Sequence, residues 1–222
     1  MPMVEVVIIG HNEGESVTDM VRSLPSEWHK IYVADRCTDR TLKRLSFAEN
    51  TTAVDTKPLG LVGRQTSFCR NLGLSECAKD SDVLFLDGDR YVVYGDIKQA
   101  VYNCDTDILL FRLEEDNRTD QSTRENYGRI CNGFFSCGIY FRRSAIDRVM
   151  KFQGGQLFNE GLQNDWGIED VSLGDVCYHL GLSVSLCEDV HLHGGFTRFR
   201  LDNLDVLERR LRFRNRLNVK WK

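Results

Sequence analysis

Two aspartates that flank a glycine, Asp87-Gly88-Asp89, have the clearest chemical potential in this sequence. They follow the apolar run 82–86 (DVLFL), which is typical of a fully buried strand. Two carboxylates one residue apart can turn toward one ligand and offer oxygens to a hard cation such as Mg²⁺ or Mn²⁺. Such a cation could bridge a diphosphate. Asp-Gly-Asp is also ordinary turn chemistry, so the triplet alone does not decide between a metal site and a turn.

A second pair of carboxylates, Glu169 and Asp170, follows Trp166 and opens a predicted helix over 169–180. The positive end of a helix dipole favours negative charge, so one interpretation is a structural role at the helix terminus. The other is catalysis, because a carboxylate can take the proton of an attacking hydroxyl. The Trp166 ring could stack on a sugar or a base, or simply pack.

Two histidines, His191 and His193, lie directly before Gly194-Gly195. Alternate residues of an extended backbone face the same way, so both imidazoles could point at one metal. A structural pair is the alternative. The glycines leave room for phosphates, which favours His193 as the ligand.

The elements that must position these residues alternate along the chain. Strands are predicted at 4–9, 30–35, 51–55, 82–86, 107–113, 138–142 and 183–187. Helices are predicted around 17–24, at 38–45 with Thr38 as the N-cap, at 64–79 and at 169–180. This alternation favours a parallel sheet, and open α/β sheets bind ligands just beyond the carboxyl ends of their strands.

Four segments, in the same order, resemble the glycosyltransferases of the GT-A fold, most closely those of family 2. The resemblance covers about residues 4–195. The segment VEVVIIGHNE resembles the family's opening strand and Asn-Glu turn, and YVADRCTDRT resembles its Val-Asp-Asp-Gly-Ser-Thr-Asp motif. The segment FCRNLGLSECAKDSDVLFLDGD resembles the Ala-Arg-Asn-x-Gly helix that leads into the Asp-x-Asp strand. The segment NDWGIEDVSLGDVCYHLGL resembles the Trp-Gly-x-Glu-Asp segment of galactosyltransferase-type enzymes.

This sequence departs from the family pattern at two places. Arg36-Cys37 replace the usual Gly-Ser, and Gly10-His11 replace the common Pro-Thr or Pro-Ala.

The resemblance implies an α/β fold: one GT-A (nucleotide-diphospho-sugar transferase) domain over residues 1–195 with a mostly parallel central sheet. A basic amphipathic helical tail, 196–222, would follow. The residues implied for the nucleotide donor are Asn12, Glu13, Asp35, Arg70 and Asp87. Those implied for the metal are Asp87, Asp89, His191 and His193. Asp170 would be the catalytic base and Glu169 would orient the acceptor. The expected acceptor side is lined by Trp166, Gly133 and Gly138.

The expected activity is transfer of a sugar from a nucleotide-diphosphate sugar, with a UDP-sugar as the donor, by an inverting single displacement that needs Mn²⁺ or Mg²⁺. A retaining outcome is the alternative, because similar enzymes of both stereochemical types have an Asp-x-Asp and histidine metal site. The acceptor would be a glycan, a lipid-linked sugar or a hydroxylated base in DNA. Two alternatives remain open: a nucleotidyltransferase, and a sugar-nucleotide-binding module without catalysis.

Composition bounds these expectations. The 222 residues, 41% hydrophobic and 28% charged, suffice for one core. Eight cysteines without a Cys-x-x-Cys pair favour a reducing compartment. No segment approaches the roughly 18 apolar residues of a membrane span, so we expect a cytoplasmic protein.

The segment 198–222 carries nine basic and three acidic residues, whereas the chain as a whole has a net charge of −4. This tail is expected either to pack as an amphipathic helix or to bind a polyanion, which would be DNA or an anionic membrane surface.

Overall fold

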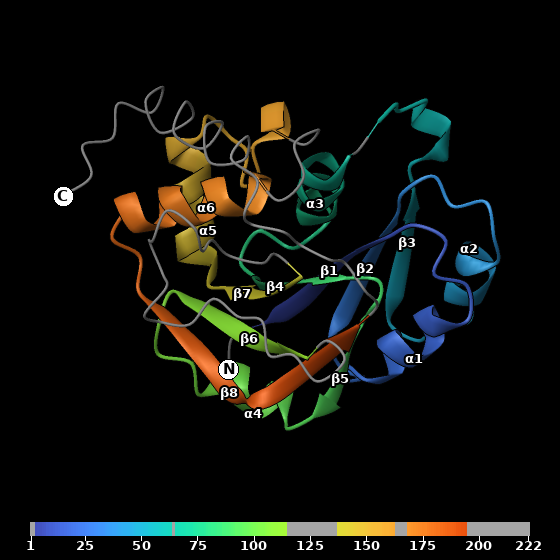
Figure 1. Ribbon diagram of the computed structural model, residues 1–222, viewed down its shortest axis with the longest axis horizontal. Coiled ribbons are helices and arrows are strands. Elements are labelled where there is room, and N and C mark those ends of the chain that lie inside the picture. The colour runs from blue at the N-terminus through green and yellow to red at the C-terminus, as the bar shows by residue number, and fades with distance from the viewer. Residues whose placement is uncertain (1–2, 64, 115–136, 163–167, 195–222) are drawn as a thin grey trace.

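The computed structural model describes residues 3–63, 65–114, 137–162 and 168–194. Within them, one eight-stranded sheet has the order β3-β2-β1-β4-β7-β6-β8-β5 (Figure 1). The strands are β1 (Val4–Gly10), β2 (His29–Ala34), β3 (Thr51–Asp55), β4 (Asp82–Asp87), β5 (Arg90–Tyr94), β6 (Ile108–Glu114), β7 (Gly138–Phe141) and β8 (Val184–Gly194). The α-helices are α1 (Ser16–Arg22), α2 (Thr41–Leu45), α3 (Thr66–Ser75), α4 (Ile97–Tyr102), α5 (Arg143–Phe152) and α6 (Ile168–His179). Short 3₁₀ turns are Lys57–Leu59 and Glu160–Leu162.

The predicted parallel sheet is confirmed in the half that contains β3, β2, β1 and β4, whose neighbouring strands are all parallel. The other half is mixed. Strand β7 is antiparallel to β4 and β6, β6 is parallel to β8, and β5 is antiparallel to β8. The backbone N–H of Val92 in β5 donates to Ser23 Oγ at 3.1 Å, just beyond α1. The sheet therefore curls, so that β5, the strand at one end of the spatial order, lies beside α1, the helix that follows β1.

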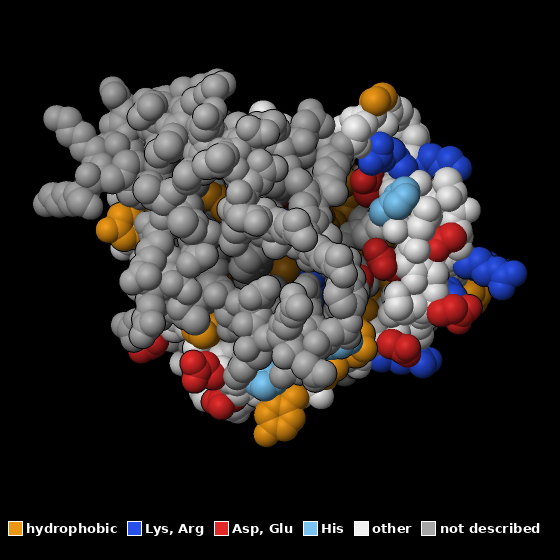
Figure 2. Space-filling view, viewed as in Figure 1, with side chains coloured by type: hydrophobic (Ala, Val, Ile, Leu, Met, Phe, Trp, Pro, Cys, Tyr) orange, Lys and Arg blue, Asp and Glu red, His pale blue; other side chains and the backbone are white. Residues whose placement is uncertain are grey.

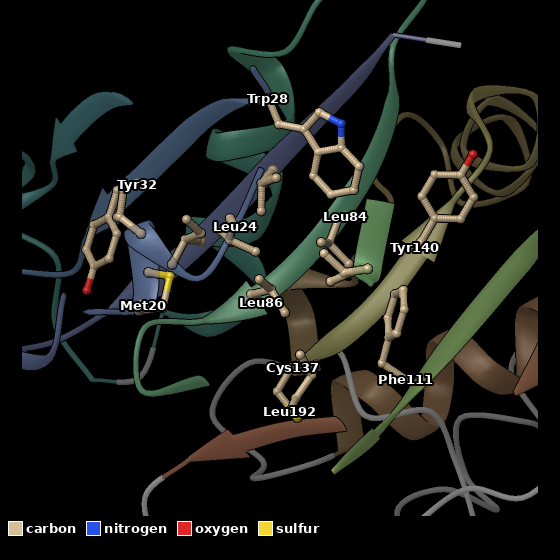
Figure 3. Close-up of a cluster of buried hydrophobic side chains, with 14 of the residues drawn as sticks. Met20, Leu24, Trp28, Tyr32, Leu84, Leu86, Phe111, Cys137, Tyr140 and Leu192 are labelled. Carbon is tan, nitrogen blue, oxygen red and sulfur yellow. The ribbon is translucent and has the colours of Figure 1, made fainter. Parts of the chain in front are cut away.

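Helices cover both faces of the sheet (Figure 1). Buried side chains of α1, α2 and α4 pack on one face, in the cluster shown in Figure 3, and those of α3, α5 and α6 pack on the other. The strands supply both clusters because successive side chains point to opposite faces. In β1, for example, Val6 and Ile8 belong to the first cluster and Val7 to the second.

A glycine sets the distance between α3 and the sheet. A Cβ atom at Gly73 would collide with the Val7 side chain and would lie 3.1 Å from Val33 Cγ2. Only glycine lets the helix backbone approach β1 and β2 this closely. One turn earlier on the same helix stands Arg70, so this close packing also positions that side chain.

The helix predicted at 38–45 is shorter than expected and is not capped by Thr38. It begins at Thr41, whose backbone N–H donates to Asp39 Oδ1 at 3.0 Å. The backbone N–H groups of Thr38 and Asp39 instead donate to Asn12 Oδ1, at 2.7 and 3.3 Å. The Asn12 side chain therefore holds Thr38 and Asp39 outside α2.

Other boundaries also differ from the predictions. The helix expected at 64–79 spans Thr66–Ser75, and the strand expected at 183–187 extends to Gly194 as β8. Strand β5 and helices α4 and α5 were not predicted. The tail at 196–222 lies outside the described residues. None of the described helices is long and apolar enough to span a membrane.

Candidate active site

The chain segments that follow β1, β2 and β4 meet at one edge of the sheet. The backbone N–H of Asp35 donates to the Gly10 carbonyl at 2.8 Å, and that of Gly88 donates to the Ile9 carbonyl at 2.7 Å. The residues after these strands are therefore adjacent, as expected for parallel strands.

A buried tyrosine explains the glycine between the two aspartates. A Cβ atom at Gly88 would lie 2.5 Å from the Tyr32 hydroxyl and 3.0 Å from Glu13 Cγ. The Tyr32 side chain is fully buried, and its hydroxyl has no hydrogen-bond partner among the described residues. Burial, followed by the charge of Glu13, raises the pKa of this hydroxyl. Only a glycine fits between Tyr32 and the site.

Arg70 joins carboxylates from two distant parts of the chain. Its Nη2 donates to Asp87 Oδ1 at 2.7 Å, while Nη1 lies 3.8 Å from Asp170 Oδ1 and 4.0 Å from Glu169 Oε1. The guanidinium is only 3% exposed and lies 5.4 Å from the centre of the Phe158 ring, within cation–π range. Arg70 and Asp87 are therefore paired through one hydrogen bond and not through a bidentate contact.

The charged groups in this cluster shift one another's pKa values. Burial alone would lower the pKa of Arg70, but Asp87, Asp170 and Glu169 outweigh it and raise the pKa. Burial, followed by the negative charge of Asp170, raises the pKa of Glu169 to about 8, with Arg70 opposing the shift. At neutral pH, Glu169 thus keeps its proton, which makes it a hydrogen-bond donor.

The acidic residues around Gly88 suit a hard cation. Burial, then Asp89 and next Asp87, raise the pKa of Glu13, because like charges close together resist ionisation. A divalent cation would relieve this repulsion, and carboxylate oxygens are its preferred ligands. The described residues contain no group of three His, Cys, Asp or Glu side chains arranged to hold a metal. One or two carboxylates are enough where substrate phosphates complete the coordination, so the residues present fit Mg²⁺ or Mn²⁺.

Solved structures of other proteins share this arrangement of strands and helices. S. aureus TarS 1–349 aligns with a TM-score of 0.64 and 19% identity, over 95% of this chain and 71% of that chain. GalNAc-T7, determined with UDP, GalNAc and Mn²⁺, aligns with a TM-score of 0.63 and 13% identity, over 99% of this chain and 55% of that chain. This chain has a GT-A-like fold.

A nucleoside-diphosphate-sugar pyrophosphorylase from Vibrio cholerae RC9 also aligns, with a TM-score of 0.51 and 13% identity, over 85% of this chain and 94% of that chain. No family model and no curated protein matches the sequence. The structural alignments therefore confirm the GT-A-like fold that the four sequence segments predict.

In this GT-A-like fold, Asp35 is held by its neighbour in sequence. Arg36 Nε and Nη2 donate to the two carboxylate oxygens of Asp35, at 2.7 and 2.8 Å. Arg36 adopts a φ of 52°, a conformation that suits the glycine found here in family 2. Each carboxylate oxygen can accept further hydrogen bonds, so the role of Asp35 toward a nucleoside stays a prediction.

The two histidines share the outer face of β8, as predicted. Leu192 between them is fully buried, whereas His191 and His193 are half-buried. The His193 ring packs on Tyr91 and the His191 ring on Tyr94, each with ring centres 5.5 Å apart. The register pairs Tyr91 with His193, which places this histidine about two residues along β5 from Asp89. Metal binding by either histidine stays a prediction.

Gly138 opens β7 opposite Leu86, next to the end of β4. The other residues expected on the acceptor side, Gly133 and Trp166, lie outside the described residues. Asn12 organises the segment before α2, as described above, and its contact with a nucleotide stays a prediction.

The sequence did not indicate two further residues of the site. Arg90 is 4% exposed, and its Nε lies 3.6 Å from Asp89 Oδ1. Its position directly after Asp-Gly-Asp could have suggested it. Cys137 is buried, and burial, followed by the charge of Asp87, raises the pKa of its thiol. No sequence signal identified this cysteine.

Proposed function

We propose that this chain transfers a sugar from a nucleotide-diphosphate sugar to an acceptor hydroxyl, with the help of a divalent cation. The observation that carries the proposal is the Arg70 cluster, in which one buried guanidinium links Asp87 after β4 to Glu169 and Asp170 on α6. The GT-A-like fold and the UDP, GalNAc and Mn²⁺ of GalNAc-T7 support the same chemistry.

The donor would bind where the segments after β1, β2 and β4 meet. Asp89 and Asp87, with Glu13 beside them, would hold Mn²⁺ or Mg²⁺, and phosphate oxygens of the donor would complete the coordination. His193 or His191 would be a further ligand only after moving closer to these carboxylates. Bound there, the cation would stabilise negative charge on the departing diphosphate. Asp35 and Asn12 would contact the nucleoside, which we expect to be uridine.

Asp170 would be the general base of a single displacement. The proton of the acceptor hydroxyl passes to a carboxylate oxygen of Asp170 as the acceptor oxygen bonds to the anomeric carbon. The bond from that carbon to the diphosphate oxygen breaks, and its electron pair leaves with the diphosphate. The configuration at the anomeric carbon is inverted.

Glu169 is suited to a different task. Because burial and Asp170 raise its pKa, it keeps its proton at neutral pH and can donate a hydrogen bond to a sugar hydroxyl. Its assigned role is to orient the acceptor. With Glu169 protonated and Asp170 ionised, the first residue can donate a hydrogen bond to the acceptor while the second accepts its proton.

The acceptor is a glycan, a lipid-linked sugar or a hydroxylated base in DNA. The basic segment 198–222 would recruit a polyanionic acceptor, since arginine binds phosphate bidentately. Trp166, Gly133 and Gly138 would line the acceptor side.

The test is release of nucleoside diphosphate. The full chain is incubated with a panel of nucleotide-diphosphate sugars and Mn²⁺, and the products are separated by chromatography. Asp89→Asn should abolish release, as should excess chelator. The control Asp80→Asn removes an exposed carboxylate before β4 and should leave release unchanged. Full activity in excess chelator would exclude the metal-dependent mechanism.

A nucleotidyltransferase is the second candidate, because the pyrophosphorylase noted above aligns over 94% of its own length. Such an enzyme joins a sugar phosphate to a nucleoside triphosphate, so pyrophosphate would appear in place of nucleoside diphosphate. A binding module would release neither product. It would still show a ligand-dependent rise in melting temperature with a nucleotide sugar and Mn²⁺.

A further inference from the structure

A cavity of about 550 Å³ lies between α1, α2 and the beginning of β2. Its apolar lining includes Val17, Leu24 and Leu45. The β2 residue that lines it is Lys30, at the opposite end of that strand from Asp35. Five residues of extended chain separate the two Cα atoms by about 16 Å, so this cavity is separate from the candidate active site.

Lys30 is a buried cation that the protein itself leaves poorly compensated. The residue is only 2% exposed, and its Nζ donates to the Ser26 carbonyl at 3.2 Å. That carbonyl also accepts from Asn50 Nδ2, at 3.3 Å. Within the described residues no carboxylate lies within 4.0 Å of Nζ. A buried ammonium without a paired anion is unfavourable, because it has lost hydration that no carboxylate replaces.

The nearby acidic residues do not neutralise this ammonium. Glu27 is engaged in an ion pair with Lys98. Burial lowers the pKa of Lys30, and the charges of Glu27 and Glu49 oppose that shift only in part. The ammonium would therefore gain from an additional anion inside the cavity.

Basic residues also outnumber acidic ones around the cavity. Its lining contains Arg22, Lys30 and Arg44, against Glu49. Arg44 forms an ion pair with Glu15 through Nη2, while its Nε is buried without a hydrogen-bond partner among the described residues. Figure 1 shows α1 and α2 next to each other at the edge of the molecule away from α5 and α6, and Figure 2 shows basic and acidic side chains mixed over them.

We propose that this cavity binds a small anion with an apolar body, of the kind in which a carboxylate or a phosphate ends a hydrocarbon chain. The anionic end lies against Lys30 with Arg44 nearby, and the apolar body covers Val17, Leu24 and Leu45. The volume falls within the about 300–1,000 Å³ of small-molecule pockets. The site is independent of the proposed transferase activity, because it occupies the other end of β2.

The test is calorimetric titration of the full chain with octanoate and, separately, with octyl phosphate. Octan-1-ol serves as the uncharged analogue of the same length. At least one anion should bind in a 1:1 ratio, and at least tenfold more tightly than the alcohol. Preference for octanoate assigns the site to carboxylates, and preference for octyl phosphate assigns it to phosphate esters.

Lys30→Met keeps the length of the side chain and removes its charge, so it should weaken anion binding at least tenfold. The melting temperature of this variant should equal or exceed that of the wild type, because a buried charge is lost. Arg44→Met, at the half-buried rim, should also weaken binding and provides a second variant. Lys43→Met, an exposed lysine of the same helix as Arg44, is the matched control and should bind as the wild type does.

Three results would overturn the proposal. The first is the absence of binding by both anions. The second is equal binding of octanoate and octan-1-ol, which would mean an apolar pocket without a role for the cation. The third is unchanged anion binding by folded Lys30→Met. None of these outcomes depends on turnover, so each is distinguishable from a failure of the proposed transferase function.

Discussion

Replacement of Arg70 by methionine tests the cluster on which the proposed site depends. Methionine retains much of the apolar stem but removes the positive charge that Asp87, Glu169 and Asp170 share. The carboxyl groups of Glu169 and Asp170 would then lie in a buried environment without this guanidinium. Folding should therefore become less favourable, independently of any substrate.

The expected magnitude follows from burial. Removal of one partner from a buried ion pair costs about 3–5 kcal/mol. Asp87 is 35% exposed and can be solvated in the variant, and Glu169 already carries a proton near neutral pH, so the low end applies. For a chain of this size, about 3 kcal/mol corresponds to a fall in melting temperature of roughly 6–12 °C.

The loss should depend on pH. Without Arg70, the positive charge that opposes the rise in the Glu169 pKa is lost, so that pKa should rise further. A folded-state pKa above the unfolded one means that the folded state binds more protons between the two values, and stability then rises as pH falls. Only above about pH 8 does the wild type lose the Glu169 proton that the variant keeps, so the gap in melting temperature between variant and wild type should be smaller at pH 7 than at pH 9.

The assay is thermal unfolding followed by circular dichroism at both pH values. Arg40→Met removes an exposed arginine just before α2 and serves as the matched control. Glu169→Gln in the Arg70→Met background should abolish the pH dependence of the gap, because the group that titrates is then absent. Equal melting temperatures for Arg70→Met and Arg40→Met, or a gap that does not change with pH, would refute the reasoning.

Three other predictions follow from the same structure. Asp170→Asn should lower turnover by about 10² to 10⁴ with nearly unchanged donor affinity, and steady-state kinetics that show a change only in the donor Michaelis constant would contradict its role as a base. In the wild type, stability to urea should fall as pH rises from about 5 to 8, because the pKa of Glu169 is higher in the folded state than in the unfolded state. In that range the unfolded chain has released the Glu169 proton and the folded protein still holds it, so rising pH favours unfolding. Glu169→Gln should flatten this dependence, and an unchanged slope would show that another group is responsible. Gly73→Ala should destabilise the protein by about 1–3 kcal/mol through its clash with Val7, and chemical denaturation should show that Val7→Ala costs less in that background than alone.

Much of the fold could be predicted from local patterns. The β-branched and apolar runs at β1, β2 and β4 predict buried strands, and the helix-like segments between them require parallel pairing. The position of Asp35 and Asp87 at one edge follows from that pairing. The strand pairing in the mixed half of the sheet was harder to predict from sequence, since periodicity reveals a strand but not the neighbour with which it pairs.

The candidate site divides in the same way. The sequence alone predicted which side chains carry chemistry: the two aspartates of the triplet, Glu169 and Asp170, all near the ends of predicted elements. That chemistry stays a prediction. Only the tertiary structure decided that Arg70 stands between Asp87 and α6, because a contact between residues so far apart in sequence depends on how α3 and α6 pack on the sheet. The same holds for the pKa of Glu169 and for the buried charge of Lys30. Both are set by loss of contact with water, and loss of contact with water depends on every element that packs around a side chain, which no local pattern specifies.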